Sequence, residues 1–325
     1  MKIQNRNILV TGGAGMIGSH LVEALLDRGC EISVIDNFSS GYPQNIAEYP
    51  NARLFNLDIA DDEGLDEVFE NGYDVVFHLA ANFANRNSVD HPERDLLTNG
   101  LGILKILDRC RRFDVSRFAY ASSSCVYGNA VGAMDEAATE FDPGTPYAMT
   151  KLLGEQYTRF YSDYHGLSTV ILRYFNCYGP REFPGKYRNV IPNFLYRALC
   201  GQPLKITGNG EETRDFCYVT DLVIGTILAA EYQGESAEIF NISGGRPTRI
   251  LELAEKINDL TGNRGGIAIE GRRTWDHVVH RQPSTCKAED DLGYSPKTSL
   301  DVGLKNTLAW MITQMDDIPA QMDHA

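Results

Sequence analysis

The sequence predicts an α/β protein built on a doubly wound parallel sheet, with a smaller cap at its C-terminal side. Three observations predict this fold class. Short β-branched runs alternate with helix-length amphipathic segments up to about residue 178. The first of these runs passes through a glycine-rich turn directly into a helical pattern. Beyond residue 178 the regular alternation stops. Strands that alternate with helices are typical of parallel sheets covered by helices on both faces.

The first quarter of the chain carries four expected strands and two expected helices. Apolar runs predict buried strands at residues 7–11, 31–35, 53–57 and 74–78. Residues 17–28 are expected to be helical because Leu21, Leu25 and Leu26 fall on one face, and Gly29 is a typical stop signal. A short acidic helix is expected at residues 62–70.

The same alternation continues to residue 178, and then it changes. Long helices are expected at residues 90–112 and 146–165, and strands at 117–121 and 168–172. Residues 179–185 are a loop by composition. Beyond them, the pattern predicts helices at 189–200, 221–231, 250–261 and 300–314, mixed with short strands at 204–207 and 237–242.

These segments suggest two parts. We expect a sheet domain over residues 1–178, to which later segments at about 214–245 return, and mainly a cap over residues 179–325. Residues 316–325 are polar and are expected to form a loose tail.

Composition excludes several classes of protein. The 325 residues include 30 Lys and Arg against 44 Asp and Glu, a formal net charge of −14. Nucleic-acid and anionic-membrane binders need a basic face, so neither class is expected. The 7 Cys are scattered without a CxxC pair or a Cys/His cluster, so neither a disulfide framework nor a metal site is expected. With no signal-peptide pattern and no apolar run near 18 residues, a cytoplasmic protein is expected.

The glycine-rich turn predicts a dinucleotide site. Its glycines are spaced Gly12-x-x-Gly15-x-x-Gly18 between the first strand and the first helix. Gly12 allows the tight turn, Gly15 lets the backbone approach a pyrophosphate at the helix N-terminus, and Gly18 lets helix and strand pack closely. An ordinary strand–helix turn is the alternative. The position at the start of the chain favours a Rossmann-type dinucleotide-binding domain.

An acidic residue at the end of the second strand selects the dinucleotide. Asp36 lies about 20 residues beyond the turn, where a carboxylate binds the adenosine ribose hydroxyls and repels a 2′-phosphate. Asn37 and Ser39 follow it, with no Arg directly behind, so NAD is expected rather than NADP. Asp58 and Ile59, after the third strand, are expected to hold the adenine edge; a common strand-end Asp is the alternative.

A tyrosine and a lysine on one helix face predict proton transfer. Tyr147 and Lys151 are spaced i, i+4. A Tyr hydroxyl titrates near pH ~10, and a nearby ammonium together with a positive cofactor ring would lower that pKa. Such a Tyr can accept a proton from a sugar or alcohol hydroxyl. Alone, this spacing is weak evidence for catalysis, because it is common by chance and an exposed helix face also explains it. A hydroxyl-rich segment, 122–124, ends the preceding strand and can contact the same substrate oxygen.

Six motifs in order give the chain a family resemblance. They are Thr11-Gly-Gly-Ala-Gly-Met-Ile-Gly18, His78-Leu-Ala-Ala81, Ser122-Ser-Ser-Cys-Val-Tyr-Gly128, Tyr147-x-x-x-Lys151, Arg173-Tyr-Phe-Asn-Cys-Tyr-Gly-Pro180 and Arg214-Asp-Phe-Cys-Tyr-Val-Thr-Asp221. Over nearly its whole length the chain resembles the extended short-chain dehydrogenase/reductase family, in the NAD-dependent nucleotide-sugar epimerase/dehydratase branch that includes UDP-glucose 4-epimerases.

The resemblance implies roles for individual residues. Tyr147 would be the base, Lys151 would hold the nicotinamide ribose, and Ser123 would assist. NAD would also contact the following residues: Gly12, Gly15, Met16, Ile17, Asp36, Asn37, Ser39, Asp58, Ile59, Leu79, Ala80, Ala81 and Asn99. Asn99 matches a helix Asn with a mainly structural role, and an ordinary polar helix residue explains it equally well.

The substrate implied is a nucleotide sugar, with UDP the commonest nucleotide in this branch. Asn176 and Arg214 match residues that contact the diphosphate, and Asn193 falls where similar enzymes bring a loop and helix onto the nucleotide. A second phosphate-binding Arg is assigned to Arg273 over Arg272. Ser124, Cys125, Arg86 and Arg281 are further expected sugar contacts. Arg281 lies near the position that limits the space around the sugar, where an Arg would suit a uronic acid; pairing with local acids or phosphate is the alternative.

The residues after Ser123 favour one reaction within the family. Dehydratases that resemble this protein carry Asp-Glu there and decarboxylases carry Glu, whereas this chain has Ser124 and Cys125. An isomerase, a 4-epimerase acting through a transient 4-keto sugar, is therefore expected. The alternatives are a dehydratase, decarboxylase or reductase on the same substrates, or a non-catalytic NAD-binding regulator. A Cys125 thiolate could act as a base, although a tolerated small residue also explains it.

Similar enzymes commonly form homodimers through two long helices. Here these are the expected helices at 90–112 and 146–165, and the apolar side chains compatible with such a contact are Leu96, Leu97, Ile103, Leu104 and Leu107. Packing in the core of one subunit explains the same residues.

Overall fold

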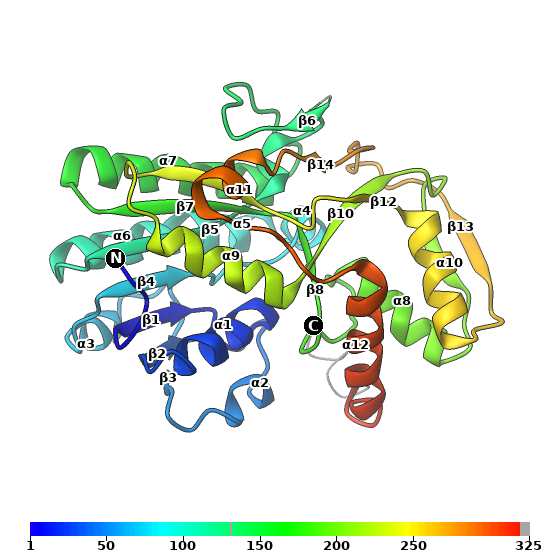
Figure 1. The fold of residues 1–325 in the computed structure, drawn as a ribbon, viewed down its shortest axis with the longest axis horizontal. Coiled ribbons are helices and arrows are strands. Elements are labelled where there is room, and N and C mark those ends of the chain that lie inside the picture. The colour runs from blue at the N-terminus through cyan, green and yellow to red at the C-terminus, as the bar shows by residue number, and fades with distance from the viewer. Residues whose placement is uncertain (131, 319–325) are drawn as a thin grey trace.

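The computed structural model describes residues 1–130 and 132–318 and is organised around one parallel sheet (Figure 1). The sheet has seven strands in the order β11-β7-β5-β4-β1-β2-β3. Their bounds are β1 Asn7–Thr11, β2 Glu31–Ile35, β3 Arg53–Phe55, β4 Val75–His78, β5 Arg117–Ser123, β7 Thr169–Tyr174 and β11 Glu238–Ile242. All neighbours pair in parallel. The chain moves outward from β1 in both directions, which confirms the doubly wound prediction.

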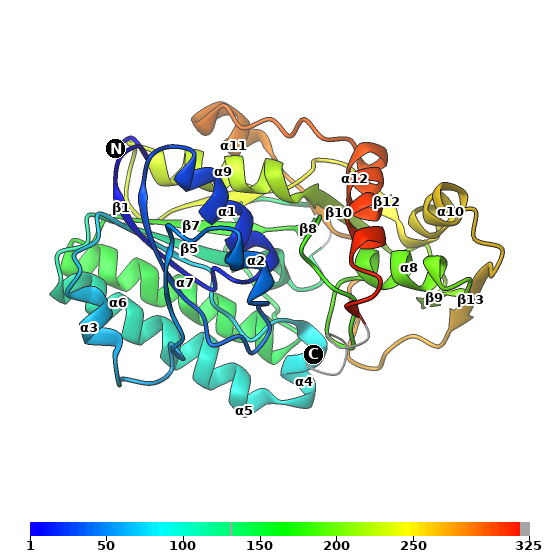
Figure 2. The same cartoon turned by 90° about the horizontal axis from the view of Figure 1, so that it is seen from below.

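Helices cover both faces of this sheet, as Figure 2 shows. On one face lie α1 (Met16–Leu26) and α9 (Val219–Glu231), and on the other lie α6 (Ile103–Arg112) and α7 (Pro146–His165). The strand period of two divides the core accordingly. Ile8 and Val10 belong to the apolar cluster on the α1 and α9 side, and Leu9 belongs to the cluster on the α6 and α7 side.

The expected helix at 90–112 is not continuous, which corrects that prediction. It consists of the end of α4 (Asn85–Asp90), then α5 (Pro92–Asp95), the π-helix η1 (Leu96–Gly102) and α6. His91 has φ −139° and ψ 63°, and Pro92 has no N–H to continue the preceding turn. The acidic helix expected at 62–70 is also shorter, because Gly64 at φ +80° delays α3 to Leu65–Phe69.

Three small sheets lie outside the central sheet, and most of their strands were not expected from the sequence. β10 (Thr213–Tyr218) pairs with β8 (Asn176–Tyr178) and β12 (Pro247–Arg249). β9 (Leu204–Thr207) pairs with β13 (Ile267–Glu270), and β14 (Gln282–Pro283) pairs with β6 (Ala133–Met134). The remaining elements are α2 Gln44–Ala47, the 3₁₀ helix η2 Ser124–Tyr127, α8 Val190–Leu199, α10 Ile250–Thr261, α11 Cys286–Leu292 and α12 Leu300–Thr313.

The expected tail falls only partly within the described part of the chain. Residues 319–325 of the expected tail lie outside it. Within residues 1–130 and 132–318, no helix combines the length and apolar character needed to cross a bilayer.

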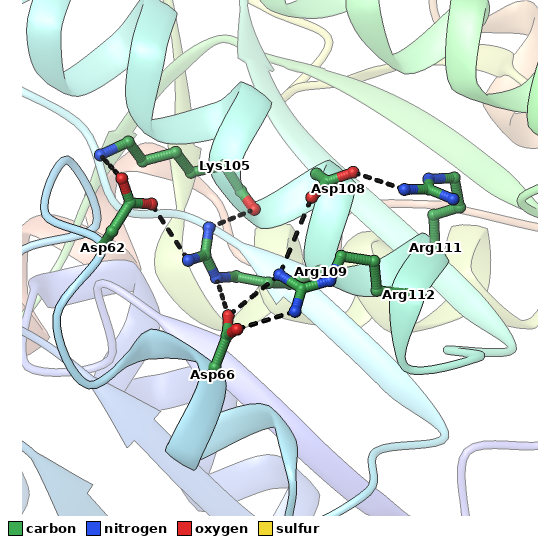
Figure 3. Close-up of polar contacts among 7 residues, drawn as sticks. All are labelled: Asp62, Asp66, Lys105, Asp108, Arg109, Arg111 and Arg112. Carbon is green, nitrogen blue, oxygen red and sulfur yellow. Dashed lines mark hydrogen bonds and ion pairs between the residues drawn. The ribbon is translucent and has the colours of Figure 1, made fainter.

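An ion-pair network ties the loop before α3, and α3 itself, to α6 (Figure 3). The nearly buried Arg109 guanidinium contacts Asp62 at 3.0 Å and Asp66 at 2.9 Å. Lys105 pairs with Asp62 at 3.0 Å, and Arg112 pairs with Asp66 at 2.8 Å. Because the two acids are shared between three cations, this network joins α3 and the loop before it to α6 more firmly than isolated surface pairs would.

Candidate active site

One cavity of about 790 Å³ runs along the carboxyl ends of the parallel strands and extends to the cap. Every predicted site residue except Asn99 lines it. The sheet domain contributes Gly12, Gly15, Met16, Ile17, Asp36, Asn37, Ser39, Asp58, Ile59, Leu79, Ala80, Ala81, Arg86, Ser123, Ser124, Cys125, Tyr147 and Lys151. From β8 onward the chain contributes Asn176, Asn193, Arg214, Arg273 and Arg281. Ligands of doubly wound sheets bind at this edge, where the strand order reverses.

The glycine-rich turn has no room for side chains. Gly12 has φ +73°, and a Cβ placed on it would lie 2.7 Å from the backbone N of Ala80. A Cβ on Gly18 would overlap the Gly12 carbonyl oxygen, so helix and turn pack as closely as the sequence predicted. Gly15 is the N-cap of α1 and has no side chain with which to cap it. The first N–H groups of the helix are therefore available to an anion.

Asp36 is held rigidly at the end of β2. Its Oδ2 accepts the N–H of Ala14 at 2.9 Å, and its Oδ1 accepts the N–H of Phe38 at 2.8 Å. Burial raises the pKa of this carboxyl. A Cβ on Gly41 would lie 2.9 Å from both carboxylate oxygens, so this glycine leaves space beside them. Across the cavity edge, the Asn37 amide donates to Asp58 at 2.8 Å.

Tyr147 and Lys151 share a buried face of α7, as the i, i+4 spacing predicted. The helix begins with Thr145 as its N-cap, whose Oγ1 accepts the N–H of Ala148 at 3.3 Å, and Pro146 occupies its first turn. Tyr147 is 6% exposed and Lys151 is 3% exposed. The Lys151 Nζ donates to the Ala121 carbonyl at 2.8 Å and lies 5.7 Å from the centroid of the Tyr147 ring.

The pKa of Tyr147 differs from our expectation. Burial raises it well above its usual value, and the Cys125 and Asp95 side chains add to the rise, while the Ser123 hydroxyl opposes it. Burial also lowers the pKa of Lys151 to about 8. Within the chain, desolvation therefore outweighs the stabilisation of a phenolate by the nearby ammonium.

A buried ion pair below the Tyr147–Lys151 face was missed by the sequence reasoning. Glu155 lies one helical turn beyond Lys151, and its Oε atoms accept two hydrogen bonds from Arg173 at 2.9 and 2.7 Å. Both side chains are 1% exposed. The Ser122 hydroxyl donates to the same carboxylate at 2.5 Å. The sequence did contain a signal for this ion pair, because an Arg lies inside an apolar strand and an acid lies on the helix that faces it.

Asn99 lies behind the cavity wall. Its side-chain oxygen accepts the N–H of Asn82 at 2.8 Å, and its amide donates to the buried Asp95 at 2.9 Å. Thr150 on α7 donates to the other Asp95 oxygen at 2.6 Å. This network joins the π-helical segment to α7, so the structure places Asn99 in a structural position rather than on the cavity surface.

The basic residues of the cap meet at the far end of the cavity. The Arg214 guanidinium donates to the carbonyls of Thr213 and Val278 at 2.9 and 3.2 Å. Burial, together with the positive charge of Arg281, lowers its pKa to about 10. Arg273 and Arg86 are exposed at the rim. The Arg273 guanidinium lies 5.5 Å from the Trp275 ring.

The loop between β8 and α8 also lines the cavity, a role that its composition alone did not indicate. Arg188 donates to the Ser40 carbonyl at 2.7 Å, and Lys186 pairs with Asp90 at 3.0 Å, so the loop is anchored on both sides. Asn193 holds this loop: its amide donates to Gly185 O at 3.1 Å and accepts Gly185 N–H at 3.1 Å.

Glu182 lies in the same loop and was not among the site residues expected from the sequence. The side chain is buried and lines the cavity. Its Oε1 accepts from the Asn189 amide at 3.0 Å, whereas its Oε2 has no partner among the described residues. Burial raises the pKa of this carboxyl to about 7.

These features fit an NAD molecule. The N-terminus of α1 supplies N–H donors that suit a pyrophosphate, and its N-cap Gly15 places no side chain over them. Asp36 presents a carboxylate with open space beside it, which suits a ribose diol. Tyr147 and Lys151 line the same cavity and would face the reactive ring of the cofactor.

The comparison with known proteins agrees with this geometry. A model of the NAD dependent epimerase/dehydratase family matches residues 8–243. The structure of the epimerase Mth375 from Methanothermobacter thermautotrophicus is 44% identical, with a TM-score of 0.95 over 98% of this chain and 95% of that chain. UDP-glucose 4-epimerase from Thermotoga maritima is 36% identical, with a TM-score of 0.90 over 95% of this chain and 99% of the other.

Relatives with a different named reaction match as well. UDP-N-acetyl-alpha-D-glucosaminuronate decarboxylase of Bacillus cytotoxicus is 34% identical over 316 residues, which cover 94% of this chain and 97% of that protein. The match extends over nearly the full length of both chains. Together with the glycine-rich turn and the Tyr147–Lys151 face, these similarities show that the chain is a member of the NAD-dependent epimerase/dehydratase family.

Proposed function

We propose that this protein is an NAD-dependent UDP-sugar 4-epimerase. The observation that carries the proposal is the buried Tyr147–Lys151 pair, which lines the same cavity as the glycine-rich turn and the basic residues of the cap. The residues after Ser123 are Ser124 and Cys125, neither of which is a carboxylic acid. A dehydratase or decarboxylase needs additional acid–base groups near C5 of the sugar, and this segment does not supply them as carboxylates.

In this proposal, NAD supplies a hydride acceptor that returns the same hydride within one turnover. Once ionised, Tyr147 would accept the proton of the C4 hydroxyl as the C4 hydrogen is removed, and it would return that proton once the sugar has turned. Ser123 donates a hydrogen bond to the same oxygen. The raised pKa of Tyr147 has to fall for this step, and the Lys151 ammonium one turn away is positioned to stabilise the phenolate.

The proposal also assigns the two parts of the chain. Residues 1–178 would hold NAD, together with later segments at about 214–245, and the cap would bind the nucleotide and diphosphate. Arg214 is suited to the diphosphate because carbonyl oxygens orient its guanidinium at the cavity. Asn193 supports the nucleotide side indirectly, through the loop that it holds.

The test is turnover of UDP-glucose, UDP-N-acetylglucosamine and UDP-glucuronic acid by purified protein without added NAD. Epimers should form with no net NADH. Tyr147→Phe should lower kcat by about 10²–10⁴-fold while NAD stays bound. Tyr164→Phe, on the same helix but 74% exposed, is the matched control. A stable keto product or CO₂ would favour the decarboxylase and dehydratase alternatives, and a normal rate in Tyr147→Phe would refute the catalytic assignment.

We further propose a homodimer that pairs η1 and α7 with the same elements of a second copy. Leu96, Leu97 and Met149 are 54%, 47% and 54% exposed on these helices. Ile103 and Leu107, which the sequence also suggested for this contact, are fully buried in the core of the subunit and are therefore excluded from it. An exposed apolar patch of this kind is typical of a protein–protein contact.

A further inference from the structure

Arg281 is a buried cation whose charge is not neutralised by any carboxylate in the described part of the chain. The residue is 6% exposed and lines the cavity. Among the residues that the structure describes, no carboxylate lies within 4.0 Å of its guanidinium, whose one hydrogen bond joins Nη1 to the Ser124 carbonyl. Burying a charge without an opposite charge is costly, so this position suits an anion that arrives with a ligand.

The other cavity-lining cations are accounted for differently. Arg181, Lys186 and Lys205 pair with acids at 2.9, 3.0 and 2.8 Å. Arg86 and Arg273 lie exposed at the rim, where water solvates them. Lys151 is buried without a carboxylate partner, but its place beside Tyr147 gives it a role. Among the cavity-lining residues that the structure describes, Arg281 is therefore a buried cation that has neither a carboxylate partner nor a role in the proposed reaction.

The backbone holds Arg281 in one place beside the reacting groups. Its N–H donates to the Thr213 carbonyl at 3.3 Å, and the next residue begins β14, which pairs with β6. Its side chain reaches the carbonyl of Ser124, the residue that follows Ser123. The guanidinium therefore lies on the sugar side of the cavity, next to a turn of neutral side chains (residues 122–125) that does not repel an anion.

We propose that Arg281 binds a carboxylate carried by the sugar, so that the substrate is a nucleotide-linked uronic acid. This inference rests on the proposed function. A guanidinium presents parallel N–H donors that match the two oxygens of a carboxylate, and with Nη1 engaged the Nε and Nη2 donors remain for it. Recognition by a buried charge also disfavours an uncharged sugar, because binding it would leave the guanidinium unpaired.

The test compares UDP-glucuronic acid, UDP-glucose and UDP on NAD-loaded protein by calorimetry and by turnover. UDP-glucuronic acid should bind about 10–100-fold more tightly than UDP-glucose. Arg281→Gln should remove this preference while UDP affinity changes less than about threefold, which also reports that the variant is folded. Arg281→Lys should retain part of the preference. The control is Arg264→Gln, which removes an exposed charge of the cap outside the cavity.

Two outcomes would overturn the proposal. One is equal binding of UDP-glucose and UDP-glucuronic acid by the unaltered protein. The other is an equal loss of affinity for UDP and both UDP-sugars in Arg281→Gln and Arg281→Lys, which would make Arg281 a diphosphate ligand. If the protein epimerises none of the sugars but binds UDP-glucuronic acid with an Arg281-dependent preference, the proposed reaction fails and the carboxylate site stands.

Discussion

Replacing Arg173 by Met should destabilise the protein strongly, because it leaves Glu155 as an unpaired buried carboxylate. Both side chains are 1% exposed, and two hydrogen bonds of 2.9 and 2.7 Å join them. Among the side chains that the structure describes, only the Ser122 hydroxyl would still donate a hydrogen bond to Glu155. Removing one partner of a buried pair costs about 3–5 kcal/mol, which is a large fraction of a typical total stability of about 5–15 kcal/mol.

The double variant Arg173→Met/Glu155→Gln separates the charge effect from the packing effect. Without either charge, desolvation no longer opposes folding, so the free energy of unfolding should recover to within about 1–2 kcal/mol of the unaltered protein. Part of the deficit will persist, because the Arg173 guanidinium also lies 4.7 Å from the Tyr127 ring centroid.

The measurement is equilibrium urea unfolding followed by circular dichroism at pH 7. Arg111→Met is the control: its pair with Asp108 is 2.8 Å long but has both side chains about 40% exposed, so its loss should cost under about 1 kcal/mol (Figure 3). Two results would refute the reasoning: Arg173→Met within 1 kcal/mol of the unaltered protein, or a double variant at least as unstable as the sum of the two single variants.

Three further predictions address the cavity and the exposed helices. Gly12→Ala places a Cβ 2.7 Å from a backbone nitrogen at φ +73°, so NAD affinity in a fluorescence titration should fall at least tenfold; unchanged affinity would contradict the tight-turn argument. Burial raises the pKa of Glu182 to about 7, so between about pH 4.5 and 7 the folded state keeps a proton that the unfolded state has released. The stability that this bound proton contributes is therefore lost as the pH rises through that range. Glu182→Gln should remove about 2.5 kcal/mol of this decline between pH 5 and 8 in urea unfolding; an equal pH slope in both proteins would count against it. Leu97→Glu and Met149→Glu should convert a dimer to a monomer in sedimentation analysis, and a persistent dimer in both variants would place the interface elsewhere.

Local patterns predicted the fold class and several of the residues that line the cavity. Alternating strand and helix periods identified the parallel sheet, and the spacing of Gly12, Gly15 and Gly18 identified the strand–turn–helix that begins it. The i, i+4 spacing was enough to place Tyr147 and Lys151 on one face. These features depend on residues close together in the chain, where helix and strand geometry alone determine which side chains share a face.

Other features required the tertiary structure. Short cap strands such as β10 pair with segments far away in the sequence, so their periodicity was too weak to reveal them. The raised pKa of Tyr147 follows from burial, which no local pattern reports. The same holds for the pairing of Glu155 on α7 with Arg173 on β7, and for the position of Arg281 beside Ser124, 157 residues earlier. Folding alone brings together the segments that decide which charges are desolvated and which of those are neutralised. The sequence therefore determined which chemical groups are available, and the fold decided where they can act.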